Sequence, residues 1–157
     1  MMEDFLVNFS MQMTIGTIRR IAHDIRNNPK PAPICVIAPV RGGLVPGVMM
    51  SHLLGIPLFP ISYSLRDHKA NEDIPDSVFE FVTRSTNKRV ILIDDIIDAG
   101  DTIKGLVAKI KDRIDEIDIE IASLIHNTAQ DFVPDYPGWP IDRNKDDEFV
   151  EFFWELT

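Results

Sequence analysis

The order of apolar and polar positions along the chain predicts alternating helices and strands. Apolar residues recur at helical spacing over residues 11–25, and this helix should end before the polar segment 27–29. Short apolar runs predict strands near 34–39, 57–63, 89–94 and 117–125, with helices near 46–54 and 102–113. Strands that alternate with helices are typical of an α/β fold with a doubly wound, mostly parallel sheet.

The stretch from residue 90 to residue 102 is the most informative part of this pattern. A run of apolar residues short enough for a buried strand is followed by Asp94 and Asp95, then by Asp98, Gly100 and Thr102. An apolar helical face begins directly afterwards. The free N–H groups of a helix N-terminus suit a phosphate, and paired carboxylates suit ribose hydroxyls, a metal or a developing cation. Together they indicate a phosphorylated sugar as the ligand.

Other proteins also place two acids after a hydrophobic strand, notably in Walker B segments and in phosphoacceptor receiver domains. The chain has no GxxxxGK[ST] sequence, which excludes a P-loop. A receiver domain would carry its acidic pair after the first strand, whereas this pair lies beyond the middle of the chain.

A second loop follows the apolar run that ends at Ala38. Gly42 and Gly43 allow the backbone to approach a ligand closely, and the Arg41 guanidinium has forked donors that fit phosphate oxygens. Pro46 suits the first turn of the next helix and Gly55 suits its end. On its own, an Arg-Gly-Gly sequence is also compatible with an ordinary strand–helix turn.

Composition narrows the possibilities further. A chain of 157 residues suits a single domain over 1–157, with 45% hydrophobic and 26% charged residues, as in ordinary globular proteins. The net charge of −9 argues against nucleic acid as a partner. Cys35 is predicted to be a buried, inert thiol. We find no candidate membrane segment or signal sequence, so the expected location is the cytoplasm, with no membrane partner.

Two segments do not fit the alternating pattern. Residues 64–77 are polar, and a solvated surface loop is expected there. Residues 131–157 are acidic and could form a loosely attached end, but the segment 149–155 is too apolar to remain in water.

The segment 90–102 resembles the phosphoribosyl pyrophosphate (PRPP) binding motif of type I phosphoribosyltransferases. It matches that motif at Asp94, Asp95, Asp98, Gly100 and Thr102, and it departs at Ala99, where the family usually has threonine, and at Asp101. The resemblance implies a type I phosphoribosyltransferase fold with a C-terminal nucleobase hood near residues 126–157. It also implies transfer of a phosphoribosyl group from PRPP to a base, with release of pyrophosphate and formation of a nucleoside 5'-monophosphate.

The resemblance also assigns roles to residues. Asp94 and Asp95 would hold the ribose hydroxyls and Mg²⁺, Asp98 would assist proton transfer, and these three are the catalytic candidates. The remaining PRPP contacts would come from Ala99, Gly100, Asp101 and Thr102, and from a pyrophosphate loop formed by Arg41, Gly42 and Gly43. The loop 64–77 would close over the site, with Arg66, His68 and Lys69 as possible contacts.

The end of the chain resembles the hood of xanthine, guanine and hypoxanthine phosphoribosyltransferases. His126 takes the place of a lysine that donates to the 6-oxo oxygen of the purine, and Phe149 that of an aromatic residue stacking on the base. Val150 would read the base edge through its backbone, and Glu155 matches an acid near the base or metal. We therefore expect a purine salvage enzyme that acts on a 6-oxopurine and forms a homodimer or higher homo-oligomer. The alternatives are a non-catalytic PRPP-binding regulator and a phosphoribosyltransferase for another base.

Overall fold

The computed structural model describes residues 6–64, 71–145 and 149–155. Its main sheet has six strands in the order β4-β3-β2-β5-β6-β7. β4 runs antiparallel to β3, and every other neighbouring pair in this sheet is parallel, which confirms the predicted architecture. The strands are β2 (Cys35–Val40), β3 (Leu58–Ser64), β4 (Asn71–Asp73), β5 (Arg89–Ile97), β6 (Asp118–Asn127) and β7 (Trp139–Ile141).

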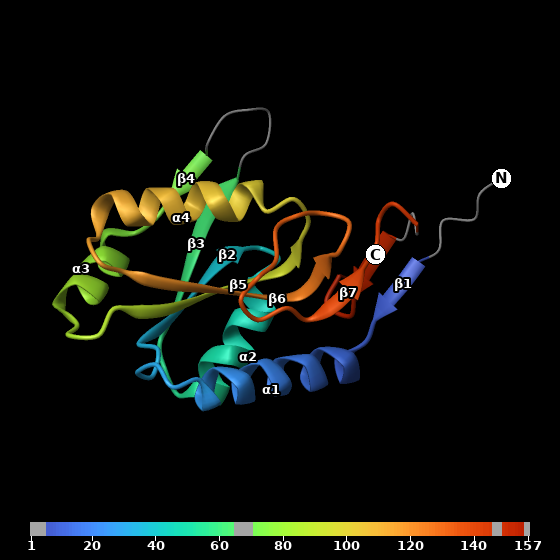
Figure 1. Cartoon of the computed structure of the whole chain (residues 1–157), viewed down its shortest axis with the longest axis horizontal. Helices are drawn as coiled ribbons and strands as arrows, with labels where there is room; N and C mark the ends of the chain where they lie inside the picture. Colours follow the sequence, from blue (N-terminus) through green and yellow to red (C-terminus); the bar gives the residue numbers. More distant parts are fainter. Residues whose placement is uncertain (1–5, 65–70, 146–148, 156–157) are drawn as a thin grey trace.

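Helices cover both faces of the sheet (Figure 1). α1 (Met11–Asn27) and α2 (Leu44–Leu54) lie on one face, and α3 (Asp76–Arg84) and α4 (Asp101–Arg113) lie on the other. Ile91 and Ile93 of β5 belong to the core on the α1 and α2 side, whereas Val90 and Leu92 belong to the core on the α3 and α4 side. Because successive side chains of a strand point to opposite faces, a strand covered on both faces needs an unbroken apolar run.

The ends of two helices follow the expected local chemistry. α1 begins after Ser10, whose Oγ accepts a hydrogen bond from the Met13 N–H at 3.1 Å. α2 carries Pro46 near its start and ends at Gly55, which has a left-handed φ of 67°.

Cys35 is buried, as predicted, and its burial raises the thiol pKa to about 12.

A separate parallel pair of strands joins the two ends of the chain. β1 (Leu6–Phe9) pairs with β8 (Phe149–Phe152), and the rings of Phe9 and Phe152 lie 5.6 Å apart. Trp154 stacks on Phe152 with 4.5 Å between ring centres. Phe9, Val150 and Phe152 belong to the same core as α1, which confirms the expectation that the apolar segment 149–155 does not remain in water as a loosely attached end.

The structure corrects three predicted boundaries. The strand predicted to end near residue 94 continues to Ile97, because β5 pairs with β6 up to Ile97 and His126, so Asp94 and Asp95 lie inside the strand. α4 begins at Asp101, one residue earlier than expected. The segment 64–77 contains β4 and the start of α3 as well as loop, and residues 65–70 lie outside the described part of the chain.

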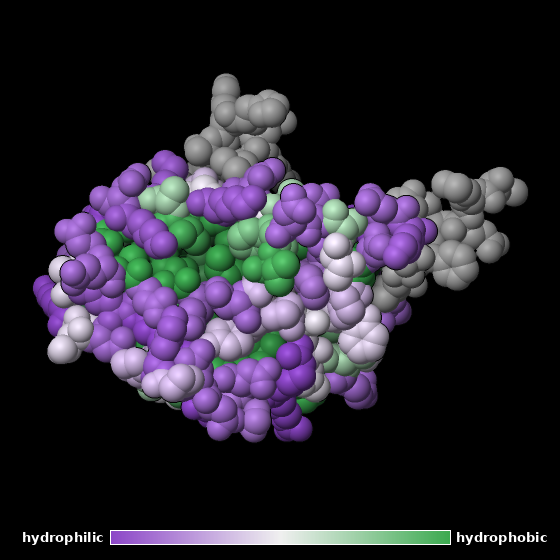
Figure 2. Space-filling view, viewed as in Figure 1, coloured by the Kyte–Doolittle hydropathy of each residue, from purple (hydrophilic) through white to green (hydrophobic). Residues whose placement is uncertain are grey.

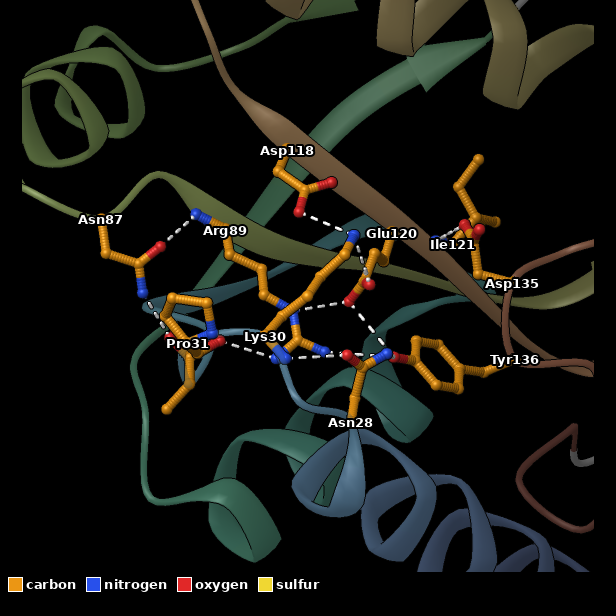
Figure 3. A network of polar contacts seen from close by, with 11 residues as sticks. Asn28, Lys30, Pro31, Asn87, Arg89, Asp118, Glu120, Ile121, Asp135 and Tyr136 are labelled. Carbon is orange, nitrogen blue, oxygen red and sulfur yellow. Dashed lines mark hydrogen bonds and ion pairs between the residues drawn. The ribbon is translucent and has the colours of Figure 1, made fainter.

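A buried polar network, called the clamp below, ties the segment after β6 to the starts of β5 and β6 (Figure 3). Arg89 is 2% exposed and donates through Nε to Glu120 Oε2 at 2.7 Å and through Nη2 to the Tyr136 hydroxyl at 3.1 Å. Asn28 Nδ2 donates to the same hydroxyl at 3.0 Å. The clamp therefore fixes Tyr136 at the amino ends of β5 and β6, at the edge of the sheet opposite to the loops that follow β2 and β5. It consists of Asn28, Lys30, Arg89, Asp118, Glu120 and Tyr136.

The face shown in Figure 2 is mainly hydrophilic, with an apolar strip between α4 and β6. These two elements contribute the partly buried residues Val107, Ile119 and Ile121 to the core beneath them. Among the described residues, no helix has the length and apolar character needed to cross a bilayer.

Candidate active site

Two loops meet at the carboxyl edge of the sheet. Residues 41–43 connect β2 to α2, and residues 98–100 connect β5 to α4. β2 and β5 are parallel neighbours, so the two loops leave the sheet next to each other. Ligands bind at such positions in open parallel sheets.

The glycines of the β2 loop permit a very close approach to the acidic pair. A Cβ atom on Gly42 would lie 2.6 Å from Asp95 Cγ, so a residue other than glycine could not occupy this place without displacing the carboxylate. A Cβ on Gly43 would lie 2.8 Å from the Pro39 carbonyl oxygen, which already accepts the Gly43 N–H at 2.9 Å. Arg41 is exposed at the start of the same loop. The structure therefore brings together the two segments that the sequence singled out separately.

Asp94 and Asp95 are half-buried side by side in β5. Asp94 Oδ1 accepts the Asp95 N–H at 2.9 Å, and Asp95 Oδ1 accepts the Ile96 N–H at 2.6 Å. Burial raises the pKa of both carboxyls, that of Asp94 well above its usual value. The charge of Asp95 adds to the rise at Asp94, and the charge of Glu155 adds to the rise at Asp95. A pair of carboxylates desolvated in this way favours ligands that supply hydroxyl donors or a positive charge.

The β5–α4 loop surrounds a pocket of about 360 Å³. All residues from 98 to 102 line this pocket, as do Asp94 and Arg143. Gly100 has φ 78°, and a Cβ there would lie 2.6 Å from the Phe132 ring, so glycine is required for both conformation and space. α4 begins at this pocket, and its first N–H groups have no hydrogen-bond partners within the helix. The pocket therefore has the form expected of an anion site.

Asp98 is held by two residues that the sequence patterns did not single out. Arg143 Nε lies 2.9 Å from Asp98 Oδ1, and Asn127 Nδ2 donates to the same oxygen at 3.2 Å. Asn127 is buried, and its own Oδ1 accepts the backbone N–H of Arg143 at 3.2 Å. These residues are 29 or more positions from Asp98 along the chain, so no local motif could reveal them. The one available signal was a rare basic residue within an acidic tail.

The four predicted base contacts lie outside the lining of the 360 Å³ pocket. His126 is half-buried on β6, its Nδ1 is buried with no hydrogen-bond partner in the described part of the protein, and burial lowers its pKa. Phe149 is 65% exposed, whereas Val150 is buried in the core. Glu155 is exposed, accepts the Phe152 N–H at 3.0 Å, and lies near enough to Asp95 to affect its pKa.

The side chains near the site restrict which metal ion could bind there. Among the described residues, no group of three or more His, Cys, Asp or Glu side chains could hold a metal ion. Asp94 and Asp95 supply two carboxylates, and Mg²⁺ often binds through one or two carboxylates together with water and substrate phosphates. The pair therefore fits a Mg²⁺ that arrives with a phosphorylated substrate. Arg66, His68 and Lys69, expected from the sequence as possible contacts, lie outside the described residues.

Comparisons with known proteins agree with this geometry. The sequence matches the family described as the phosphoribosyl transferase domain over residues 11–157. A purine phosphoribosyltransferase from Pyrococcus horikoshii has 28% identity and a TM-score of 0.76, with 97% of this chain and 95% of that chain covered. A xanthine-guanine-hypoxanthine phosphoribosyltransferase from Helicobacter pylori has 17% identity and a TM-score of 0.77, with 96% and 94% covered. A hypoxanthine-guanine phosphoribosyltransferase from Bacillus anthracis has 22% identity and a TM-score of 0.66, with 88% and 82% covered. No curated protein sequence matches the chain.

Proposed function

The chain belongs to the phosphoribosyltransferase family, and we propose that it transfers the 5-phosphoribosyl group of PRPP to a 6-oxopurine. The acceptor would be xanthine, guanine or hypoxanthine, and the products would be pyrophosphate and a nucleoside 5'-monophosphate. The similarity to a structure named as a purine phosphoribosyltransferase supports a purine as the acceptor.

One observation carries the proposal: the contact between Gly42 and Asp95. It joins a cationic loop, suited to pyrophosphate, to a carboxylate suited to ribose. The 360 Å³ pocket at the start of α4, which Asp94 also lines, then provides for the 5-phosphate. PRPP carries these three groups in the same order, with pyrophosphate and 5-phosphate at the two ends of the ribose.

The proposed reaction forms a bond between a purine ring nitrogen and C1 of the ribose. The bond from C1 to the pyrophosphate oxygen breaks, and its electron pair leaves with pyrophosphate. Asp94 and Asp95 accept hydrogen bonds from the ribose hydroxyls, and their charge stabilises the cation that develops at C1. Asp98, which is exposed at the end of β5, accepts the proton that the purine nitrogen loses.

The anionic ends of PRPP are assigned to different groups. The Arg41 guanidinium and the N–H groups of Gly42 and Gly43 bind pyrophosphate. The N–H groups of residues 99–102 and the Thr102 hydroxyl bind the 5-phosphate. Mg²⁺, when bound with PRPP, supplies positive charge that stabilises the leaving pyrophosphate.

Recognition of the base is assigned to the hood. Phe149 offers an exposed ring for stacking, the backbone of Val150 reads the base edge, and Glu155 provides an acid near Asp95. The buried, unpartnered Nδ1 of His126 supports a polar contact with a ligand, since a buried polar atom without a partner is costly. The lowered pKa keeps this imidazole neutral at pH 7, so one ring nitrogen can donate to a 6-oxo oxygen.

A panel of bases tests the proposal. The protein is incubated with PRPP, Mg²⁺ and one of xanthine, guanine, hypoxanthine, adenine, uracil or orotate, and pyrophosphate release is measured. We expect release with at least one 6-oxopurine and at most a small rate with pyrimidines. Because a neutral imidazole can also accept a hydrogen bond, adenine is the critical comparison. A preference for adenine would contradict the 6-oxopurine assignment, and release with pyrimidines alone would contradict the purine assignment.

A further inference from the structure

Arg143 is the single cationic residue that lines the 360 Å³ pocket within the described part of the chain. The other lining residues all come from positions 94–103, and the charged ones among them are Asp94, Asp98 and Asp101. A 5-phosphate dianion would therefore enter a pocket that already contains three acids. The helix N-terminus offsets part of this charge, and Arg143 supplies the one full positive charge among the described residues that line the pocket.

Hydrogen bonds hold the backbone at Arg143 in place, whereas its side chain is partly exposed and can change its partner. The buried Asn127 amide accepts the Arg143 N–H at 3.2 Å, and Thr128 N donates to the neighbouring Ile141 carbonyl at 2.7 Å. The Arg143 side chain is 40% exposed and uses its Nε for Asp98 at 2.9 Å. A guanidinium has further N–H donors on its two terminal nitrogens, and it bonds phosphate as well as carboxylate. The same anchored residue can thus reach either anion at the pocket.

We propose that Arg143 exchanges partners when substrate binds, moving from Asp98 to the 5-phosphate. In the free protein it neutralises Asp98, and in the substrate complex it binds the phosphate. This proposal rests on the proposed function, since it assigns the pocket to the 5-phosphate and Asp98 to proton transfer.

The exchange would link binding of the 5-phosphate to the release of Asp98 for its role in proton transfer. Asn127 Nδ2 donates to Asp98 Oδ1 at 3.2 Å, so Asp98 keeps its orientation when the guanidinium leaves. When the phosphate is bound, the Asp98 carboxylate is no longer occupied by the guanidinium, whereas in the empty pocket it is paired with Arg143.

Binding experiments with substrate fragments test this exchange without needing a base. Ribose 5-phosphate and pyrophosphate are titrated separately, with Mg²⁺, into wild-type protein, Arg143→Gln and Arg143→Lys by calorimetry. We expect Arg143→Gln to weaken ribose 5-phosphate by about tenfold, as for one partly exposed charge-assisted hydrogen bond. Pyrophosphate affinity should not change, and Arg143→Lys should recover part of the loss. Lys145→Gln is the matched control, because Lys145 is 80% exposed, pairs with Asp142 at 3.0 Å and does not line the pocket.

Steady-state kinetics separates partner exchange from a simple positioning role. Exchange predicts that Arg143→Gln raises KM for PRPP while kcat stays within about threefold, because the variant leaves Asp98 free but loses a phosphate contact. If Arg143 merely positioned Asp98, kcat would fall, whereas KM for PRPP and the affinity for ribose 5-phosphate would not change. This result would overturn the proposal. Equal weakening of ribose 5-phosphate and pyrophosphate, or no weakening of either, would also overturn it. If wild-type protein binds ribose 5-phosphate with the expected dependence on Arg143 but turns over no base, then the proposed function fails and the phosphate contact stands.

Discussion

Removing one member of the clamp should destabilise the fold far more than removing a surface ion pair. The side chains of Arg89 and Glu120 are 2% and 6% exposed, with 2.7 Å between Nε and Oε2. Glu120 also lies 3.0 Å from Lys30 Nζ and 3.3 Å from the Tyr136 hydroxyl (Figure 3). Glu120→Ala leaves the buried Arg89 guanidinium without its carboxylate, and breaking a buried pair in this way costs about 3–5 kcal/mol.

The matched control is the ion pair between Arg113 and Asp76. Its N–O distance is 2.9 Å, but the two side chains are 51% and 82% exposed. Asp76→Ala should therefore lower the free energy of unfolding by no more than about 1 kcal/mol. Urea denaturation of both variants at neutral pH, followed by circular dichroism, measures the difference.

A double variant shows whether the cost comes from an unpaired buried charge. Arg89→Met together with Glu120→Leu removes both charges and retains apolar volume, so it should recover most of the stability lost in Glu120→Ala. If Glu120→Ala and Asp76→Ala lose the same stability within about 1 kcal/mol, then the reasoning from burial is wrong.

Four further predictions concern the site. Asp94→Asn with Asp95→Asn should reduce turnover by orders of magnitude with the fold intact, and normal turnover with PRPP would exclude the pair from catalysis. The raised pKa of Asp94 means that the folded state binds its proton more tightly than the unfolded state, so this group's contribution to stability falls as pH rises from about 4 towards the raised pKa. Asp94→Asn alone should therefore raise Tm at neutral pH, and this gain should vanish near pH 3; a gain that is independent of pH would contradict the assignment. Arg41→Lys should weaken PRPP and leave ribose 5-phosphate unchanged in calorimetry, whereas an equal loss for both would show that Arg41 does not contact pyrophosphate. His126→Lys should keep 6-oxopurine turnover and His126→Phe should lower it selectively; a change in Tm alone would make His126 a structural residue.

Much of the fold could be predicted because its strongest signals are local. The unbroken apolar run at 90–93 and the helical spacing in α1 each follow from burial within a single element. The glycine pair at 42–43 predicted a close approach of the backbone, and in the structure a Cβ on Gly42 would meet the Asp95 carboxylate.

The features that the sequence did not reveal depend on contacts between distant segments. β1 and β8 are short and pair from opposite ends of the chain, so neither shows a pattern long enough to identify it. α3 follows a polar segment and has only three buried residues, Val78, Phe79 and Val82. The partners of Asp98 come from the end of β6 and from beyond β7, and their roles become visible only when the sheet is assembled.

We propose above that this chain forms a nucleoside 5'-monophosphate from PRPP and a purine. The most direct test is to incubate the protein with PRPP, Mg²⁺ and hypoxanthine, and to identify the product by chromatography and mass. We expect inosine 5'-monophosphate, formed in equal amount to pyrophosphate, and we expect the Asp94→Asn, Asp95→Asn variant to form none. If folded wild-type protein forms no nucleotide with hypoxanthine, guanine, xanthine or adenine, then the chain does not transfer phosphoribosyl groups to purines.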